Sequence, residues 1–232
     1  MWYQLDEGIL LLLNIEVMNK FVFLIKQIIA GKSILRSYLD YSLLSIELRG
    51  KTIDIGGGSG SGYVSFVKRS SDVVFETFDL KAGQQVDFEK DNLPALDNSY
   101  DTVLFLNVME HIFNYQHIAN EVLRITKKDG QLIGYVPFLM WYHPDHSDYF
   151  RYTHEAIEKI FYSAGAKQVK VLPNFSGPFV AGLQMIVCSM PRLFRPVAFS
   201  MVYLLDYIFF KIKKMSLSQS NYILGYVFLI NK

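Results

Sequence analysis

Short apolar runs alternate with segments of helical spacing through the middle of this chain. Strands are predicted at Thr52–Ile55, Val73–Phe78, Gln84–Phe88, Thr102–Leu106, Gln131–Val136, Ala166–Leu172 and Tyr222–Ile230. Helices are predicted between them over residues 60–70, over Phe113–Ile125, and from a cap at Thr153 to about Ala164. Strands that alternate with helices predict an α/β fold with a doubly wound parallel sheet.

The flanking segments extend this pattern into a single domain of 232 residues. Residues 1–50 are predicted to form N-terminal helices, and residues 51–172 form the core with the alternating pattern. Residues 173–220 are predicted as an apolar helical insertion, and residues 221–232 as the last strand. This length suffices for one domain with a full hydrophobic core.

A glycine-rich turn follows the first predicted strand. Residues 52–62 read Thr-Ile-Asp-Ile-Gly-Gly-Gly-Ser-Gly-Ser-Gly. Glycine has no Cβ, so such a backbone can adopt positive φ and approach a ligand closely. A strand, a glycine turn and a helix together are typical of nucleotide-cofactor sites. The dinucleotide spacing fails at Ser61 or Tyr63, and Tyr63 also replaces the lysine of a phosphate-binding loop, which disfavours a nicotinamide oxidoreductase.

The glycines of this turn instead have the spacing Asp54-x-Gly56-x-Gly58-x-Gly60, an acidic residue followed by a glycine at every second position. Here the chain resembles the class I S-adenosylmethionine-dependent methyltransferases over roughly residues 50–172. The resemblance implies S-adenosyl-L-methionine as cofactor and a seven-stranded, mostly parallel sheet whose last strand is antiparallel. The cofactor-binding residues it implies are Asp54, Gly56, Gly57, Gly58, Gly60, Asp79, Leu80, Asp87, Phe88, Asn107 and Val108.

The resemblance also gives these residues individual roles. Asp79 closes the second strand, where a carboxylate accepts hydrogen bonds from the two ribose hydroxyls. Asp87 is expected at the adenine amino group, with Phe88 packing on the ring. Asn107 is expected near the reacting sulfonium. For Asp54 two roles stay open, because it lies along the methionine end or organises the loop through backbone N–H groups.

A second polar cluster, residues 143–153, follows the fifth strand of the core. It resembles a His-Pro-x-x-Tyr-x-Arg-Tyr/Phe-Thr pattern of methyltransferase-domain proteins that we associate with surface-polysaccharide and other small-molecule biosynthesis. A neutral histidine accepts a proton well near pH 7. The catalytic candidates are, in order, His143, His146 and His111, although His111 has the alternative role of ordering the next helix.

Acceptor-binding residues are predicted in the same cluster. They are Tyr142, Asp148, Tyr149, Arg151 and Tyr152. Aromatic faces and hydrogen-bonding edges suit a sugar, and they also suit a phenol or quinol. Arg151 has the alternative of a salt bridge within the loop. A metal site at His143, Asp145, His146 and Asp148 matches no motif spacing, so no metal is predicted.

Composition limits the partners and the compartment. The formal net charge is +1, and Cys188 is the only cysteine, so neither a nucleic-acid partner nor an intrachain disulfide is expected. Residues 178–214 are apolar and flanked by basic residues. Neither this segment nor Gly8–Ala30 is a convincing membrane span from sequence. Three interpretations of residues 178–214 stay open: helices buried in the core, a peripheral membrane contact, or a homodimer interface.

The sequence therefore predicts an S-adenosylmethionine-dependent methyltransferase with a small-molecule acceptor, a saccharide or lipid-linked saccharide hydroxyl. A quinol or other lipid-intermediate methyltransferase, and a catalytically silent methyltransferase-like binding protein, are the alternatives. We expect a cytoplasmic protein, with peripheral contact at the inner membrane face as a hypothesis.

Overall fold

The computed structural model describes residues 7–57, 62–78, 86–144 and 147–232, with side chains from Val17 onward. The helices are α1 (Glu7–Ile29), α2 (Ile34–Leu43), α3 (Tyr115–Ile125), α4 (His154–Ser163), α5 (Pro178–Ile186) and α6 (Arg195–Lys213). The strands are β1 (Glu47–Leu48), β2 (Lys51–Ile55), β3 (Lys68–Arg69), β4 (Val74–Phe78), β5 (Tyr100–Leu106), β6 (Thr126–Pro137), β7 (Gln168–Ser176) and β8 (Tyr222–Asn231).

The central sheet has the order β4-β2-β5-β6-β8-β7. The strands β4, β2, β5 and β6 pair in parallel, whereas β8 is antiparallel to both β6 and β7. The predicted mostly parallel sheet with an antiparallel last strand is therefore confirmed. It contains six strands among the described residues, where seven were expected.

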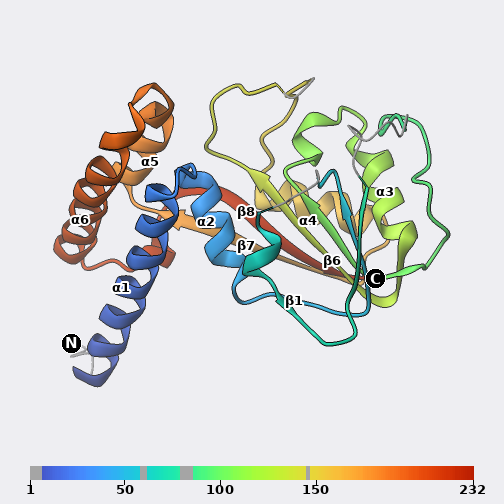
Figure 1. Cartoon of the computed structure of the whole chain (residues 1–232), viewed down its shortest axis with the longest axis horizontal. Helices are drawn as coiled ribbons and strands as arrows, with labels where there is room; N and C mark the ends of the chain where they lie inside the picture. Colours follow the sequence, from blue (N-terminus) through green and yellow to red (C-terminus); the bar gives the residue numbers. More distant parts are fainter. Residues whose placement is uncertain (1–6, 58–61, 79–85, 145–146) are drawn as a thin grey trace.

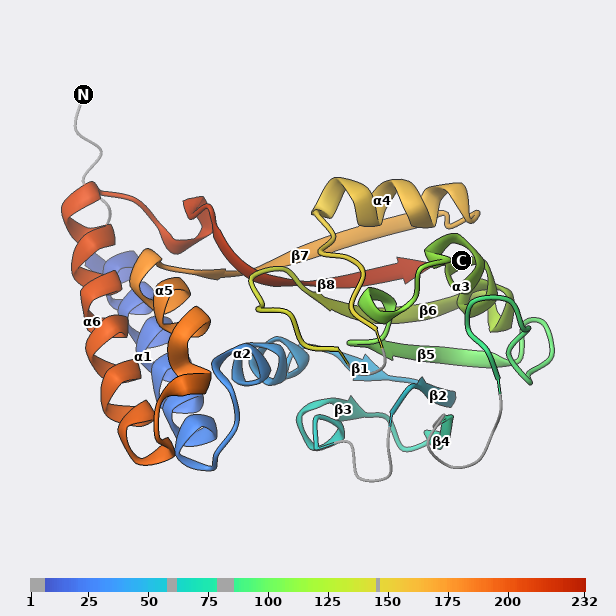
Figure 2. The same ribbon diagram turned by 90° about the horizontal axis from the view of Figure 1, so that it is seen from above.

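Both faces of the sheet are covered by helices (Figures 1 and 2). Successive side chains of a strand point to opposite faces, and β5 shows the consequence. Val103 and Phe105 pack in the core that α3 and α4 share, whereas Leu104 and Leu106 pack in the core on the side of α2. All four are buried, which explains why this strand reads as a continuous apolar run.

Two predicted elements are wrong in the described residues. In place of a helix over residues 60–70, the chain forms a short 3₁₀ turn, Val64–Phe66, and then β3. Parallel pairing of β3 with β1 determines this backbone, and helical spacing cannot reveal such a long-range contact. The third predicted strand, Gln84–Phe88, is absent over its described residues 86–88. These residues lead into a turn in which the Asp87 carboxylate accepts the Glu89 N–H.

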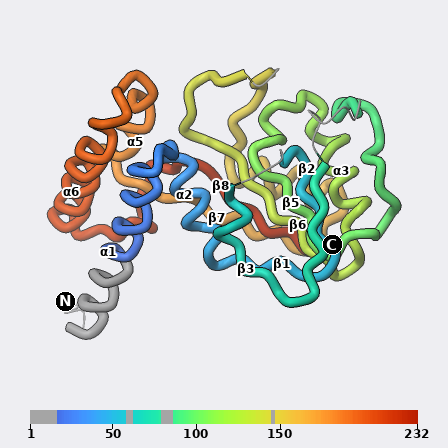
Figure 3. The backbone as a smooth tube through the Cα atoms, viewed as in Figure 1, coloured from blue at the N-terminus to red at the C-terminus, as the bar shows by residue number. Residues whose placement is uncertain are grey.

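The helical insertion forms a cluster with the N-terminal helix. The backbone leaves the sheet after β7, forms α5 and α6, and returns as β8 (Figure 3). Both views place α5 and α6 beside α1, at one end of the sheet (Figures 1 and 2). The Tyr203 hydroxyl donates to the Val17 carbonyl at 3.3 Å, and the Asp206 carboxylate accepts from the α5 backbone. These contacts fix α6 on its two neighbours.

One helical segment of the described chain has the length and apolar composition needed to cross a membrane. It is Arg192–Lys213, which contains an 18-residue window with a mean hydropathy of 1.5, of which 17% is buried. This differs from the sequence-based expectation, which found no convincing span because basic and acidic residues interrupt the apolar run. The structure places those residues at the ends of α6 and, for Asp206, on its inner face.

Candidate active site

The predicted site residues follow three neighbouring strands. The parallel strands β2, β5 and β6 are adjacent in the sheet, so their carboxyl ends lie at the same edge. Ligands of open α/β sheets bind at such an edge. It brings together the glycine turn after β2, the 3₁₀ turn Met109–His111 after β5, and the loop of residues 138–153 after β6.

The described part of the glycine turn is closely packed. Gly56 has φ +77°, and a Cβ there would lie 2.5 Å from a methyl group of Val108. A Cβ on Gly57 would overlap the Asp54 carboxylate. The turn therefore needs glycine at both positions, which brings its backbone against the end of β5. Gly58 and Gly60 lie outside the described residues.

Asp54 is fully buried at the end of β2. Its Oδ2 accepts a hydrogen bond from the phenol of Tyr63, which lies just beyond the glycine turn. The contact closes the turn back onto its own strand through a phenol rather than through the backbone N–H groups that the sequence suggested, and a role of Asp54 at the methionine end stays a prediction. Sequence reasoning used Tyr63 only to exclude a phosphate-binding loop. Its position directly after the last glycine is the feature of the sequence that could have indicated a contact with the turn.

Asn107 turns the chain at the end of β5. It adopts φ +55°, a left-handed conformation that asparagine tolerates better than most residues. Its N–H donates to the Tyr135 carbonyl of β6 at 2.9 Å. Val108, which is buried, then packs against Gly56. Asn107 and Val108 thus lie beside the glycine turn, as their predicted cofactor role requires.

The predicted adenine residues lie after β4. The Asp87 carboxylate accepts the Glu89 N–H at 3.0 Å and pairs with Lys90 at 3.1 Å; the Glu89 bond lowers its pKa. Phe88 is buried and its ring centroid lies 6.1 Å from that of Phe78. Phe88 is therefore part of the core at the end of β4. Asp79 and Leu80 lie outside the described residues.

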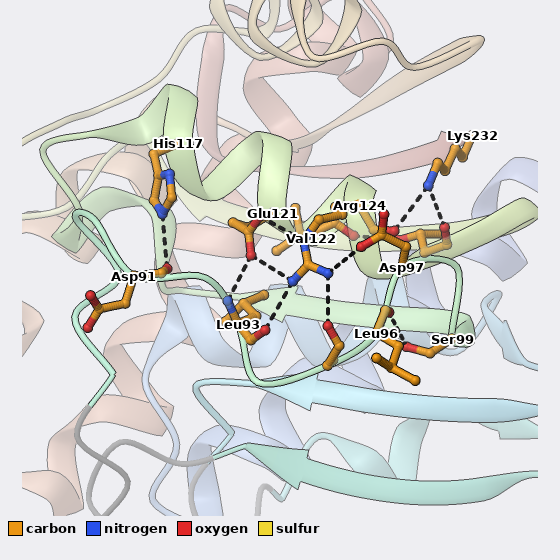
Figure 4. A network of polar contacts seen from close by, with 12 residues as sticks. Asp91, Leu93, Leu96, Asp97, Ser99, His117, Glu121, Val122, Arg124 and Lys232 are labelled. Carbon is orange, nitrogen blue, oxygen red and sulfur yellow. Dashed lines mark hydrogen bonds and ion pairs between the residues drawn. The ribbon is translucent and has the colours of Figure 1, made fainter.

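A network around Arg124 holds the segment that follows Asp87 (Figure 4). The Arg124 guanidinium binds both oxygens of Glu121 at 2.8 Å, the carboxylate of Asp97 at 2.7 Å and the Leu93 carbonyl at 3.0 Å. Glu121 in turn accepts the Leu93 N–H at 2.7 Å. These bonds fix residues 91–99, the segment after the predicted adenine residues, to α3.

Two histidines and a carboxylate lie together at the carboxyl ends of β5 and β6. His111 follows β5 and His143 follows β6, and their ring centroids are 5.3 Å apart. The His111 Nδ1 bonds the Ser147 carbonyl at 2.5 Å, and because a carbonyl only accepts, Nδ1 carries a proton; in the neutral ring the free lone pair is then on Nε2. That Nε2 is 3.8 Å from Oε1 of Glu110.

Glu110 is a functional candidate that sequence reasoning missed. It is fully buried, and neither carboxylate oxygen has a hydrogen-bond partner among the described residues. Burial raises the pKa of Glu110 to about 8. A charged residue directly before His111 in the apolar stretch Val108–Ile112 was the signal in the sequence.

An ion pair orients His143. The Asp148 Oδ2 accepts the His143 backbone N–H at 3.0 Å and lies 3.5 Å from its Nδ1. Arg151 binds both Asp148 oxygens, at 2.6 and 2.7 Å, and lowers the pKa of Asp148 to about 2. Burial lowers the pKa of His143, so its ring is neutral at pH 7. Arg151 is engaged within the loop, which is the alternative that the sequence left open.

The predicted acceptor tyrosines differ in exposure. Tyr142 is 73% exposed and Tyr149 48% exposed, and Tyr149 contacts the exposed Phe113 edge-on with 5.4 Å between ring centroids. Tyr152 is buried and donates to the Met109 carbonyl, so it is a core residue that cannot contact an acceptor without rearrangement. His146 lies outside the described residues.

Comparison with known proteins identifies the family. The sequence profile described as "Methyltransferase domain" matches residues 30–168, more than half of the chain. The chain belongs to this methyltransferase-domain family. An uncharacterized methyltransferase of Mycobacterium sp. (strain KMS) is 29% identical over 106 residues, 41% of this chain and 41% of the relative. The match thus spans less than half the length of that curated relative.

Other similarities are more distant. An uncharacterized protein of Methanocaldococcus jannaschii is 50% identical over 42 residues, 18% of either chain. The solved structure of a SAM dependent methyltransferase from Archaeoglobus fulgidus has a TM-score of 0.48 and 14% identity, covering 90% of this chain and 94% of that one.

The methyltransferase prediction is confirmed by this family match, and S-adenosylmethionine remains the predicted cofactor. The described residues fit this cofactor, because the close-packed glycines leave bare backbone beside Asn107 at the carboxyl edge.

Proposed function

We propose that this methyltransferase acts on a hydroxyl group of a saccharide or lipid-linked saccharide that is presented at a membrane surface. The observation that carries the acceptor class is the set of exposed aromatic rings, Phe113, Tyr142 and Tyr149, beside His111 and His143. Aromatic faces bind the apolar faces of sugar rings, and the polar edges of tyrosine and histidine bind hydroxyls.

The bound cofactor supplies an electrophilic methyl group on a sulfonium. The protein then has to align the acceptor oxygen with that carbon, exclude water and provide for the loss of the hydroxyl proton. In this proposal the glycine turn and Asn107 bind the methyl donor, and the loop of residues 138–153 binds the acceptor. His143, which is neutral at pH 7, and His111 lie where the proton leaves.

Membrane presentation is supported by the outer face of α6. Large apolar side chains on this face are strongly exposed, among them Val197 (61%), Met201 (63%), Leu204 (57%) and Ile212 (73%). The inner face, with Phe199, Tyr203 and Asp206, is used for packing on α1 and α5. The other face of α6 thus exposes apolar side chains to water. An exposed apolar patch of this kind marks a site that binds a protein or a membrane.

The basic residues at both ends of α6 favour an anionic membrane as the partner of this apolar face. Arg192 and Arg195 precede the exposed apolar face, and Lys211, Lys213 and Lys214 follow it. Basic residues at the margins of an apolar helical face bind anionic headgroups while the face enters the interface. The contacts of α6 with α1 and α5 support an orientation in the plane of the membrane, because a spanning helix would have to leave them.

The acceptor is tested by transfer of labelled methyl groups from S-adenosylmethionine. Candidate acceptors are free saccharides, lipid-linked saccharides and quinols, and the product is identified by mass spectrometry. We expect an O-methyl saccharide, formed faster from the lipid-linked form. Label on the quinol alone would replace the proposal with the quinol alternative. Cofactor binding without transfer to any acceptor would favour the silent binding protein.

The membrane surface is tested with the double variant Met201→Gln/Leu204→Gln and sedimentation with anionic vesicles. Two half-inserted side chains contribute about 1.5–2 kcal/mol, so binding should fall by roughly tenfold or more. The matched control is Val74→Gln/Leu96→Gln, since these side chains are at least about as exposed (60% and 82%) but lie outside α6. Wild-type protein that stays in the supernatant, and self-associates through the same residues, would assign the surface to a homodimer.

A further inference from the structure

Three potential metal ligands converge at the carboxyl ends of β5 and β6. Glu110 and His111 follow β5, and His143 follows the adjacent parallel strand β6. One ligand atom of each residue lies within 4.8 Å of the other two, the only such group in the part of the chain that the structure describes. Of the four residues considered for a metal from sequence, His143 belongs to this group and Asp148 does not, while Asp145 and His146 lie outside the described residues.

The Glu110 carboxyl group is completely buried, and both of its oxygens are without hydrogen-bond partners among the described residues. The basic nitrogen within ion-pair distance is His111 Nε2, at 3.8 Å, which carries a charge only when that ring is protonated. A buried carboxylate is costly, so the group is protonated unless the carboxylate is paired or bound to a metal. The charged neighbours Asp148 and Arg151 are already paired with each other at 2.6 Å. A cation between Glu110 and the histidines would satisfy these oxygens.

The histidines are prepared as ligands. The His111 Nδ1–H donates to the Ser147 carbonyl, and a hydrogen bond of this kind fixes the tautomer in which Nε2 is free to bind a metal. This Nε2 lies 3.8 Å from Glu110 Oε1. Two ligand atoms, each about 2.1 Å from one tetrahedral metal ion, are separated by about 3.4 Å. The His111 and Glu110 ligand atoms therefore have to approach by a few tenths of an ångström, and the widest separation in the group, which is within 4.8 Å, has to shrink by at most about 1.4 Å.

We infer that Glu110, His111 and His143 form a binding site for a divalent transition-metal cation of the Zn²⁺ or Mn²⁺ class. Two imidazole nitrogens and one carboxylate oxygen suit these ions better than Mg²⁺ or Ca²⁺, which prefer oxygen ligands. Three protein ligands leave coordination positions open, as a site that also binds substrate requires. His143 and His111 are partly exposed, so a ligand can approach from their side.

The role of this site in catalysis rests on the proposed function. The acceptor hydroxyl oxygen would bind the cation, which lowers the pKa of the hydroxyl, and its proton would leave to bulk water. The oxygen lone pair then forms the bond to the methyl carbon while the carbon–sulfur bond breaks. The products are the methyl ether and the neutral thioether of the cofactor. In this arrangement His143 acts as a ligand and the proton does not remain on it.

The test is calorimetric titration of the full, chelator-treated chain with ZnCl₂ and with MnCl₂, without donor or acceptor. We expect one bound cation per chain, and roughly 100-fold or more weaker binding in Glu110→Gln and in His143→Gln. The matched control is His154→Ala/Glu155→Gln, an exposed histidine–carboxylate pair 3.2 Å apart that should not affect binding. Thermal unfolding of each variant checks that it is folded.

A second measurement needs no variant. Zn²⁺ should protect His111 and His143 of the wild-type chain, but not His154, from modification by diethyl pyrocarbonate, as read by mass spectrometry. The inference is overturned if the wild-type chain binds neither cation at roughly 1 mM, if both variants bind as the wild type does, or if protection is equal at all three histidines. Because these readouts do not use methyl transfer, failure of the metal site and failure of the proposed function are distinguishable.

Discussion

The ion pair between Asp148 and Arg151 makes stability depend on acid pH in a way that can be calculated. The Asp148 side chain is only 2% exposed and Arg151 binds both of its oxygens, which lowers the pKa to about 2 from 3.8. A shift of about 1.8 units corresponds to about 2.4 kcal/mol of stability at neutral pH. The folded state binds the proton less tightly than the unfolded state, so this stability is present above pH 4 and is lost as the pH falls.

The assay is urea unfolding of the wild type and of Asp148→Asn at pH 5.5 and at pH 3. With these pKa values, about 1 kcal/mol of the contribution is lost by pH 3 and the rest below it. The variant lacks this loss, so the difference in free energy of unfolding between the two proteins should shrink by about 1 kcal/mol. The exposed Asp129→Asn serves as control. An equal pH dependence of wild type and Asp148→Asn would refute the assignment of the ion pair.

Two further predictions concern the cofactor side. Asp79→Ala should weaken S-adenosylmethionine binding roughly ten- to a hundredfold in calorimetry, because a carboxylate hydrogen bond contributes about 1.5–3 kcal/mol; unchanged affinity would disprove its ribose role. Arg124→Ala should reduce the free energy of unfolding by about 2–3 kcal/mol, because it leaves the buried Glu121 carboxylate with one fewer charged partner. A loss below about 0.5 kcal/mol in chemical denaturation would show that the network adds little to stability.

The six strands of the central sheet were predictable because local patterns determine them. The run Thr102–Leu106 is buried on both faces and lies in the middle of the sheet, where a parallel strand must be apolar throughout. The helix α4 also begins after the cap at Thr153 and ends before Gly165, as predicted. Thr153 accepts the Ala156 N–H, and Gly165 has φ +98°. Each of these features depends on residues that are neighbours in the chain.

The errors arise where distant residues decide the local structure. The segment after the glycine turn has helical spacing, but Tyr63 bonds to Asp54 and β3 pairs with β1. In the candidate site, the sequence named His111 and His143 but could not bring Glu110 into contact with them. That contact depends on the adjacency of β5 and β6, which a single sequence does not state.

The apolar insertion shows the same limit for function. Composition alone left buried helices, membrane contact and a dimer interface open for α6, because all three need apolar residues. The structure separates its two faces, since Phe199 and Asp206 point inward while Met201 and Leu204 are exposed. Which face is packed follows from Asp206, whose carboxylate accepts the Phe179 and Val180 N–H groups at the start of α5.

The proposed membrane surface and the proposed acceptor site are connected through the loop after β6. Met140 and Trp141 of this loop pack on the core that includes α5, and the Gln184 amide of α5 contacts the Met140 sulfur at 3.6 Å. The carbonyls of Met140 and Trp141 also accept hydrogen bonds from Arg151, which positions Asp148 and, through it, His143. We expect a displacement of α5 at a membrane surface to reach His143 through this path of contacts, and methyl transfer in the presence and absence of anionic vesicles tests this. Such a path gives a physical reason for an enzyme of this design to act faster on an acceptor held at the membrane than on the same group free in solution.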